Sequence, residues 1–288
     1  MSAHRHAIAM DGASAQSEPP EVDSTRSIVC VAVTVTREVT YAIDDLTMVA
    51  HLARPAGDGP WPAVLIGHDG IGLEDYQRSR ADALAAHGYA ALAMDYHGGE
   101  LFFGRPEAML ARVLPLLGDA DRMHAIGRAA LDVLLAVPGV AADRIGALGY
   151  GAGGRIVLEL ARRAAGFKAV AVVHPALPDV SVEGWTDSTG AFLLSTGSED
   201  PICTPDQLLT FGSALERAGV DWRVNVYGGA EHAFWARPTN PDGSPVEGST
   251  HTQATVPGVG YHPTHTPRAW RAVLDLFDET LATVPQAG

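Results

Sequence analysis

An aspartate and a histidine each follow a short apolar run in the second half of the chain. Asp200 comes shortly after Phe192–Ser195, and His232 comes shortly after Trp222–Val226. An imidazole oriented by a carboxylate can act as a general base near neutral pH. The pair therefore predicts proton-transfer chemistry, and the structural alternative is a hydrogen bond that serves the fold alone.

Further polar residues follow other apolar runs of the same kind. In chain order they are His68, Asp69, Tyr150 and His174. Because the carboxyl ends of parallel strands meet at one edge of a sheet, where α/β proteins bind ligands, these residues should gather there. Each alone is more often a hydrogen-bonding residue of the fold, but together they predict a polar pocket.

The segment Gly149–Gly154 reads Gly-Tyr-Gly-Ala-Gly-Gly and separates an apolar run from a helical pattern. Such small residues are typical of a nucleophile elbow, in which a strand turns sharply into a helix. The middle position is Gly151, which has no atom that can attack a carbonyl. We expect the backbone N–H of Ala152, together with that of Gly70 or Ile71, to stabilise an oxyanion.

The elements that must hold these residues alternate between strand and helix. Two β-rich runs, Glu38–Ile43 and Thr47–Arg54, predict an antiparallel hairpin through Asp44 and Asp45. After it, apolar runs predict buried strands at Pro62–Gly67, Tyr89–Met94, Arg144–Gly149, Ala169–Val173, Phe192–Ser195 and Trp222–Val226. Apolar residues at helical spacing predict helices at Tyr76–His87, before Pro138, at Ile156–Ala164 and at Trp270–Leu281. The pattern predicts an α/β fold with a mainly parallel central sheet flanked by helices.

The length of 288 residues fits one α/β domain with tails. We predict a single domain over residues 38–284 and a disordered leader over residues 1–30, which mixes charges, small residues and proline. The stretch 237–267 is rich in Pro, Gly, Thr and His. A loop of that length is more often functional than a linker, so we expect it to cover the site.

The composition narrows the classes of partner. A net charge of −14, with a single lysine, argues against a nucleic-acid-binding protein. No apolar run approaches the roughly 20 residues that a membrane span needs. Two cysteines cannot build a disulfide framework, which fits a reducing compartment. We expect a cytoplasmic monomer or homodimer that binds a small carbonyl compound and needs no cofactor.

Several ordered motifs resemble the dienelactone hydrolase family of the α/β-hydrolase superfamily, over about Glu38 to Leu281. That family has Gly-Tyr-Cys-x-Gly-Gly at the elbow, Gly-x-x-Asp at the acid and His-x-Phe at the base. Here these segments are Gly149–Gly154, Gly197–Asp200 and His232–Phe234, and Val256–Tyr261 resembles a subgroup. The resemblance implies an α/β-hydrolase fold, with Asp200 and His232 as the acid and base of a triad.

Two departures from the family pattern bear on the chemistry. Gly151 occupies the position of the nucleophilic cysteine, so the family's acyl-enzyme mechanism cannot run there. Asp69 stands where a glutamate near the thiol is usual. Glycine adopts the strained elbow backbone without cost, so the fold itself should survive the change.

Other candidates are weaker. Cys203 follows the acid and not the elbow, so it cannot easily reach the oxyanion donors. His262, His265 and His251 lie in the long loop without the spacing of a zinc motif, so we expect no metal site. The glycine loop lacks the spacing of a dinucleotide site and the lysine of a phosphate loop. Phe234 and Trp235 are expected to wall an apolar part of the pocket, although packing alone explains aromatic residues there.

Three functions remain open from the sequence. The first is hydrolysis of an ester, lactone or related carbonyl compound by water that His232 and Asp200 activate. The second is acid–base chemistry without a covalent intermediate, as a lyase, isomerase or cyclase acting on an enolisable carbonyl compound. The third is a binding protein that has kept the pocket and lost turnover.

Overall fold

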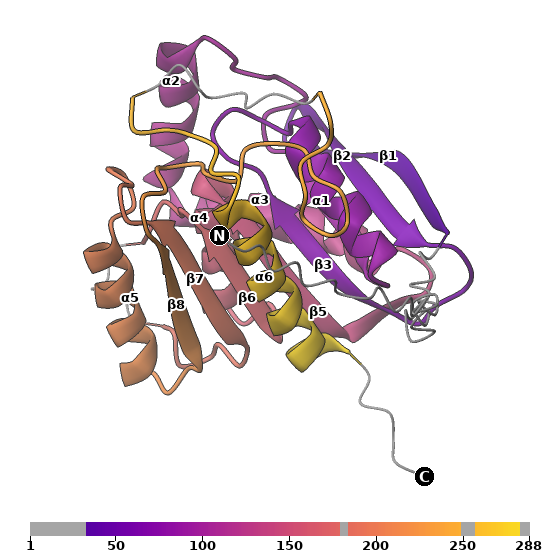
Figure 1. The fold of residues 1–288 in the computed structure, drawn as a ribbon. Helices are drawn as coiled ribbons and strands as arrows, with labels where there is room; N and C mark the ends of the chain where they lie inside the picture. The colour runs from indigo at the N-terminus through magenta and orange to yellow at the C-terminus, as the bar shows by residue number, and fades with distance from the viewer. Residues whose placement is uncertain (1–32, 179–183, 249–256, 283–288) are drawn as a thin grey trace, which may run out of the picture. The chain divides into compact units, whose positions relative to one another are not determined.

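The computed structural model describes residues 33–178, 184–248 and 257–282. Their strands form one eight-stranded sheet in the order β1-β2-β4-β3-β5-β6-β7-β8 (Figure 1). The strands are β1 Thr34–Ile43, β2 Leu46–Pro55, β3 Trp61–Gly67, β4 Ala90–Met94, β5 Val140–Tyr150, β6 Ala169–Val173, β7 Ala191–Gly197 and β8 Trp222–Tyr227. All pairings from β4 to β8 are parallel, which confirms the predicted mainly parallel sheet.

The N-terminal hairpin is also confirmed. β1 and β2 pair antiparallel from Thr34↔Pro55 to Ile43↔Leu46. Asp44 in the turn has φ 52, a left-handed conformation that aspartate tolerates better than most residues. β2 then pairs antiparallel with β4, so the hairpin extends the parallel sheet at one edge.

The central strands consist of short apolar runs because both their faces are covered. All five residues of β4 and all five of β6 are buried. The strand that follows β3 in sequence, β4, lies on one side of β3 in the sheet. The next strand in sequence, β5, lies on the other side of β3, and the later strands continue outward from β5. The direction of winding therefore reverses between β3 and β5, which is where open α/β sheets bind ligands.

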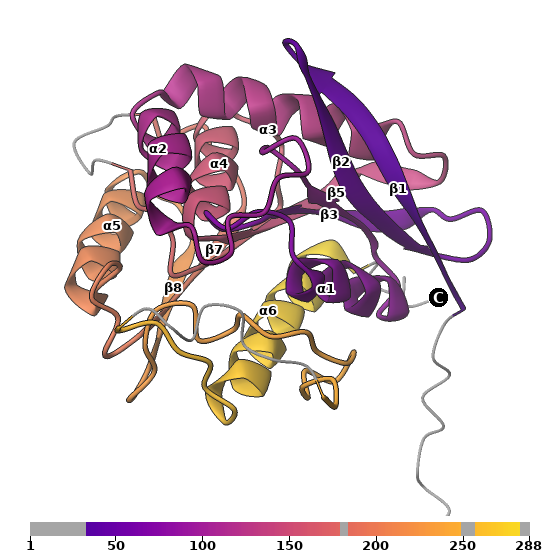
Figure 2. The same ribbon diagram turned by 90° about the horizontal axis from the view of Figure 1, so that it is seen from above.

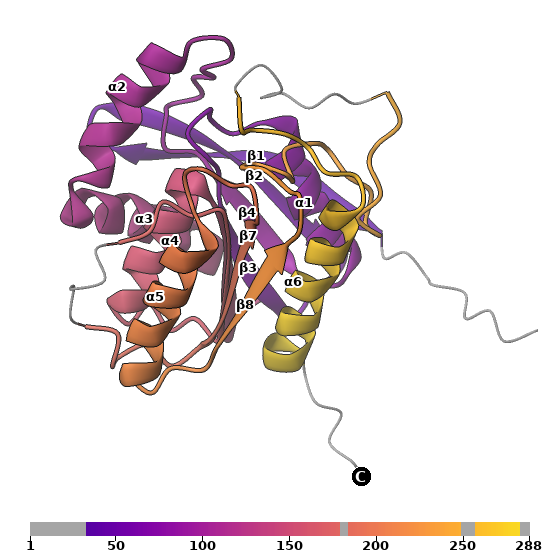
Figure 3. The ribbon, with the colours of Figure 1, turned by 60° about the vertical axis from the view of Figure 1, so that its left-hand side comes forward.

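Helices cover both faces of the sheet (Figure 2). α1 Asp75–Ala86 and α6 His265–Leu281 lie on one face, and α3 Ala120–Leu135, α4 Gly151–Arg162 and α5 Pro205–Arg217 lie on the other. The remaining helix, α2 Pro106–Leu117, packs against α3 and α4 instead of against the sheet. It lies towards the same end of the molecule as the long segment after β8 (Figure 3).

The long stretch 237–267 divides into two described parts. Residues 237–248 pack beside α1 and α6, where the Trp270 indole N–H donates to the Pro241 carbonyl at 2.9 Å and Arg80 bonds Thr239. Residues 257–267 run past the end of β8 and lead into α6. The predicted leader, residues 1–30, lies outside the described residues. No helix among those described is long and apolar enough to cross a membrane.

Candidate active site

Asp200 and His232 form a hydrogen-bonded pair at the ends of β7 and β8. His232 Nδ1 lies 2.9 Å from Asp200 Oδ2 and 3.1 Å from Oδ1. The Asp200 carboxylate is fully buried and also accepts the backbone N–H groups of Ile202 and Cys203, both at 2.8 Å. Because Nδ1–H donates to the carboxylate, Nε2 is the nitrogen left free to accept a proton.

The surroundings of Asp200 keep it charged. Burial by itself would raise the pKa of the carboxyl, but the hydrogen bond and positive charge of His232 and the Cys203 amide lower it below its usual value. An ionised Asp200 stabilises the imidazolium that forms when His232 takes a proton. The pair can therefore perform general base catalysis.

The loop that carries His232 is fixed by the segment 257–261. The His232 N–H donates to the Gly258 carbonyl, and the Gly260 N–H donates to the His232 carbonyl, both at 3.0 Å. The next residue, Ala233, has φ 54, in the left-handed region. The segment Val256–Tyr261 carries the resemblance to a subgroup of the family, and its first residue, Val256, lies outside the described residues.

Gly151 begins α4 at the end of β5 and has φ +49, the left-handed conformation of an elbow. A Cβ at this position would lie 3.2 Å from Asp69 Cβ and 3.8 Å from His174 Nδ1. A Cβ at Gly153 would meet the His68 carbonyl at 2.2 Å, so a glycine is needed where the elbow packs on β3. The structure therefore has the sharp turn of a nucleophile elbow but no nucleophilic side chain at its tip.

The oxyanion donors expected from the sequence differ in availability. The Ile71 N–H donates to Asp69 Oδ1 at 2.9 Å and is therefore occupied. The Ala152 N–H lies in the first turn of α4, where helical N–H groups have no intrahelical acceptor. Among the described residues, neither Ala152 N–H nor Gly70 N–H has a hydrogen-bond acceptor. The geometry thus favours Ala152 and Gly70 over Ile71.

Asp69 and His174 flank the elbow. Asp69 is buried and accepts the Tyr76 hydroxyl at 2.6 Å. His174 is buried at the end of β6, and its ring centroid lies 4.4 Å from that of His232 with the rings edge to face. Burial and the neighbouring positive charge of His232 lower the pKa of His174 to about 3. His174 is therefore a neutral imidazole at neutral pH.

These residues open onto one cavity of about 400 Å³. Of the residues predicted for the pocket, it is lined by Asp69, Gly70, Ile71, Gly151, Ala152, His174 and His232. The remaining lining is mostly apolar: Phe102, Gly104, Arg105, Pro106, Met109, Val113, Leu117, Ala176, Ile202 and Val259. A cavity with titratable side chains at one end and mostly apolar side chains around the rest suits a small organic substrate.

Four predicted pocket residues do not line this cavity. The His68 ring turns away, lying 3.7 Å from the Tyr96 ring with Nδ1 donating to the Asp69 carbonyl at 2.6 Å. Tyr150 is buried against Tyr76 and Trp235. Phe234 and Trp235 are fully buried in the core. Trp235 makes a cation–π contact with Arg80 and packs edge to face against Trp270. A turn begins at Ala233, whose carbonyl accepts the Ala236 N–H at 2.9 Å, and both aromatic residues lie within this turn.

Sequence reasoning missed the wall that α2 supplies. Met109, Val113 and Leu117 lie on one face of α2 and line the cavity. Their spacing of i, i+4 and i+8 is an apolar stripe that the sequence does contain. The stripe predicts a buried helix face, and only the tertiary structure shows that a cavity lies beneath it.

The weaker candidates lie apart from this arrangement. Burial and the charge of Asp200 raise the pKa of the Cys203 thiol to about 12, so it carries no thiolate at neutral pH. His262 and His265 have ring centroids 4.2 Å apart, but no group of three metal-ligating side chains exists among the described residues. His251 lies outside those residues.

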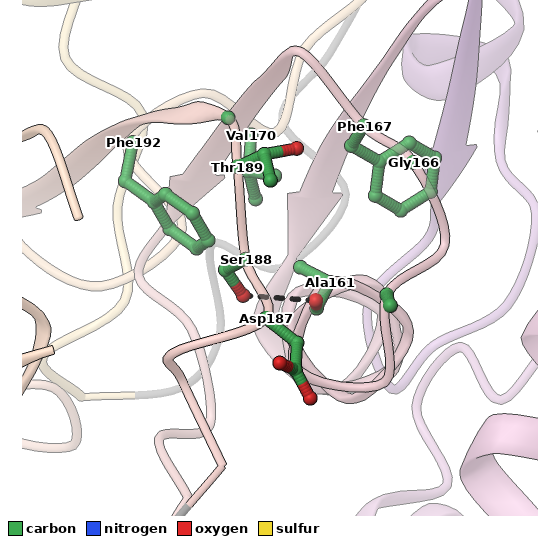
Figure 4. A pocket seen from close by; sticks show the side chains of 10 residues that line it. Ala161, Gly166, Phe167, Val170, Asp187, Ser188, Thr189 and Phe192 are labelled. Atoms are coloured by element: carbon green, nitrogen blue, oxygen red, sulfur yellow. Dashed lines mark hydrogen bonds between the residues drawn. The ribbon is translucent and has the colours of Figure 1, made fainter. Parts of the chain in front are cut away.

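A second cavity, of about 230 Å³, lies at the amino ends of β6 and β7, the opposite end of the sheet (Figure 4). The Ser188 hydroxyl there donates to the Ala161 carbonyl at 2.9 Å, as the dashed line in Figure 4 marks. Asp187 supplies the charge, and Phe167 and Phe192 are among the apolar residues. It holds no base–carboxylate pair, so it is not the candidate active site.

Comparisons with known proteins point to one family. A family model described as the dienelactone hydrolase family matches residues 48–281. A Bradyrhizobium protein named as a probable 2-oxo-3-(5-oxofuran-2-ylidene)propanoate lactonase is 28% identical over 194 residues, 65% of this chain and 78% of that protein.

Two solved structures cover 86% of this chain and 99% of their own, each with a TM-score of 0.75. One, called m3DLH, is 34% identical, and the other, a dienelactone hydrolase-like promiscuous phosphotriesterase from metagenomic libraries, is 28% identical. The resemblance inferred from the motifs is thereby confirmed. The chain belongs to the dienelactone hydrolase family and is an ester- and lactone-hydrolase-like protein with glycine at the elbow.

Proposed function

We propose that this protein hydrolyses an uncharged ester or lactone and uses water in place of the missing nucleophile. The observation that carries the proposal is the hydrogen bond between Asp200 and His232, together with the position of His232 in the lining of the same cavity as Gly151. His232 Nε2 takes a proton from water as the water oxygen attacks the carbonyl carbon. The N–H groups of Ala152 and Gly70 stabilise the oxyanion.

The second half of the reaction returns the proton. The tetrahedral intermediate breaks its bond to the leaving oxygen, and the imidazolium of His232 protonates that oxygen. An ester gives an acid and an alcohol, and a lactone gives one hydroxy acid. In serine proteases that have lost a triad residue, oxyanion donors and binding still supply roughly 10³–10⁴ over water, so weak hydrolysis without a nucleophilic side chain is reasonable.

The cavity wall supports an uncharged substrate. The cation among its described lining residues is Arg105, whose Nη1 lies 3.0 Å from Glu100 Oε1 and whose guanidinium stacks over Phe102 at 5.1 Å. Asp69 supplies negative charge in this lining, and the whole chain carries −14. A substrate carboxylate would therefore meet apolar walls and a repulsive field.

The test is an assay of purified protein on 4-nitrophenyl esters and small lactones, with intact-mass analysis. We expect turnover with no initial burst and no acylated protein, and a loss of about 10²-fold or more in His232→Ala. His124→Ala, in α3 and outside the cavity lining, is the control and should keep full activity. Equal activity in His232→Ala and the wild type would refute the proposal.

The same preparation separates the alternatives. Deuterium exchange at a substrate carbon without hydrolysis would indicate the acid–base lyase, isomerase or cyclase reaction. Thermal stabilisation by esters or lactones without any turnover would indicate a binding protein, because a ligand of the native state stabilises it by RT ln(1 + [L]/Kd).

A further inference from the structure

His174 lies beside the position that a nucleophile would occupy, opposite Asp69 in the same cavity lining. Its Nδ1 lies 3.8 Å from the Cβ that Gly151 lacks, and its ring contacts that of His232 at 4.4 Å. Both histidines and Gly151 line the same cavity. The two imidazoles therefore border the space above the elbow.

The ring of His174 has no hydrogen-bond partner among the described residues. Neither Nδ1 nor Nε2 is bonded, although the residue is 1% exposed. Burying a polar group without a hydrogen bond costs about 1–3 kcal/mol, and most buried side-chain polar atoms in proteins are bonded. An unbonded imidazole at the edge of a ligand cavity indicates a partner that arrives from the cavity.

The backbone of His174 is held in an unfavourable conformation. Its φ is 42, in the left-handed region, and it precedes Pro175, where extended backbone is the usual state. The His174 N–H donates to the Ser195 carbonyl at 2.8 Å, which fixes the end of β6 against β7. Residues held in strained backbone conformations cluster at active sites and ligand clamps.

We infer that His174 is a second catalytic imidazole, which together with His232 binds the attacking water above Gly151. This inference rests on the proposed function. The water places one hydrogen on His232 Nε2 and the other on a ring nitrogen of His174, and its lone pair then faces the substrate carbonyl. In the attack, the first hydrogen moves to His232 as the oxygen–carbon bond forms. His174 keeps its hydrogen bond to the oxygen and takes no proton.

The protonation state of His174 fits this role. Burial and His232 hold the pKa of His174 at about 3, so the ring stays neutral and one ring nitrogen remains an acceptor. A neutral ring also avoids a positive charge beside His232, which would disfavour the imidazolium that catalysis forms. The two histidines thus have different tasks, set by their partners: His232 is hydrogen-bonded to a carboxylate and His174 is not.

A crystal structure of the wild-type protein provides a test that does not need turnover. We expect an ordered water within about 3.2 Å of both His232 Nε2 and a ring nitrogen of His174. In Gly151→Ala, the added methyl group takes this space at 3.2 Å from Asp69 Cβ, so the water and the activity should both be lost. A dry space between the two rings in the wild type would overturn the inference.

Kinetics of two His174 variants provide the second test. Asparagine tolerates the left-handed backbone and keeps a polar group, so His174→Asn should lose less than about tenfold in kcat. His174→Gly relieves the strain and removes the ring, and we expect a loss of about tenfold or more in kcat with KM little changed. Imidazole added to the buffer should restore the kcat of His174→Gly, because it can fill the space that the His174 ring vacates.

The controls separate this inference from the proposed function. Thermal melting establishes that each variant is folded, and His124→Asn should match the wild type because His124 lies outside the cavity lining. Activity that needs His232 but is unchanged in folded His174→Gly would refute the role of His174 alone. Activity that does not need His232 would refute the proposed function as well.

Discussion

The Tyr76 hydroxyl donates a hydrogen bond of 2.6 Å to Asp69 Oδ2, while Asp69 Oδ1 accepts the Ile71 N–H at 2.9 Å. One side chain of α1 therefore fixes the carboxylate that shapes the turn after β3. Gly70, whose N–H we assign to the oxyanion, lies within this turn. The bond couples the packing of α1 to the geometry of the candidate active site.

Replacing Tyr76 with phenylalanine should lower both stability and activity. A buried carboxylate loses a donor, which costs about 1.5–3 kcal/mol of unfolding free energy because hydrogen bonds to charged groups are the stronger ones. Activity should fall because Asp69 no longer holds the turn that presents Gly70. Urea denaturation measures the first effect, and kcat on a 4-nitrophenyl ester measures the second.

The chain offers a matched control for Tyr76→Phe. Tyr89 donates a hydrogen bond of the same length, 2.6 Å, to Asp278, but neither residue lines the cavity. Tyr89→Phe should lower stability and leave kcat unchanged. A variant Tyr76→Phe that keeps full kcat would show that Asp69 does not transmit the effect of Tyr76 to the site.

The strand ends could be predicted from sequence because a buried parallel strand is a short apolar run and the residues after it carry the chemistry. This rule predicts Asp200 and His232, and the structure brings them into hydrogen-bond contact. The elbow could also be predicted from its glycines, and the structure shows why a glycine is required there: close packing on β3 excludes a side chain at Gly153. These features depend on local sequence and on one topological rule.

Side-chain direction could not be predicted. His68 and Asp69 are adjacent after β3, yet Asp69 faces the cavity and His68 packs on Tyr96, because neighbouring residues leave the backbone in different directions. The inward turn of Trp235 depends on the left-handed Ala233 and on the position of Arg80 in α1. Both outcomes depend on contacts distant in sequence.

Acid should destabilise the protein between about pH 6.5 and pH 3 through His174 and His97. Burial lowers the pKa of each to about 3, whereas the unfolded chain takes up a proton near the usual value of 6.5. The unfolded state binds more protons as pH falls, so each histidine reduces stability by about 2 kcal/mol at pH 5 relative to neutral pH. Urea denaturation at pH 7, 6 and 5 measures the loss.

Two comparisons check the cause of this acid sensitivity. His174→Asn and His97→Asn should each reduce the slope of stability against pH, whatever they do to stability at pH 7. Asp95 has a pKa of about 2 because its hydrogen bonds and the charge of His68 outweigh the effect of burial. The ionised Asp95 therefore stabilises the folded protein above about pH 4, and this contribution is lost only as the pH falls below that value. An unchanged slope in both histidine variants would contradict the prediction.

The charge of the substrate should matter through the apolar wall of α2. We expect 4-nitrophenyl butyrate to exceed the 4-nitrophenyl monoester of succinate in kcat/KM by about tenfold or more, since a carboxylate would be buried without a partner. Met109→Lys places a cation in the cavity wall and should narrow or reverse this ratio. Added salt should weaken the gain from the new charge.

The residue beside Met109 provides the control for this charge effect. Leu110 is 45% exposed and does not line the cavity, so Leu110→Lys makes the same change in net charge at a neighbouring position of α2. Its substrate ratio should equal that of the wild type. A shift of the same size in both variants would mean that long-range charge, and not contact in the cavity, decides the preference.

Restoring the nucleophile tests how much of the family's site survives. Gly151→Cys puts a thiol at φ +49 with its Cβ 3.2 Å from Asp69 Cβ, so Asp69 must yield slightly and stability should fall by about 1–2 kcal/mol. If His232 and Asp200 retain their geometry, the variant should show an initial burst and a trapped acyl group by intact mass.

Both the burst and the acyl group should disappear in Gly151→Cys combined with His232→Ala. Gly219→Cys, at φ +75 after α5 with open space around it, is the control for backbone strain and should show neither. A folded Gly151→Cys that never acylates would mean that the cavity no longer admits a carbonyl in line with the elbow. The water-based hydrolysis proposed here would then lose its support, because it requires the same approach.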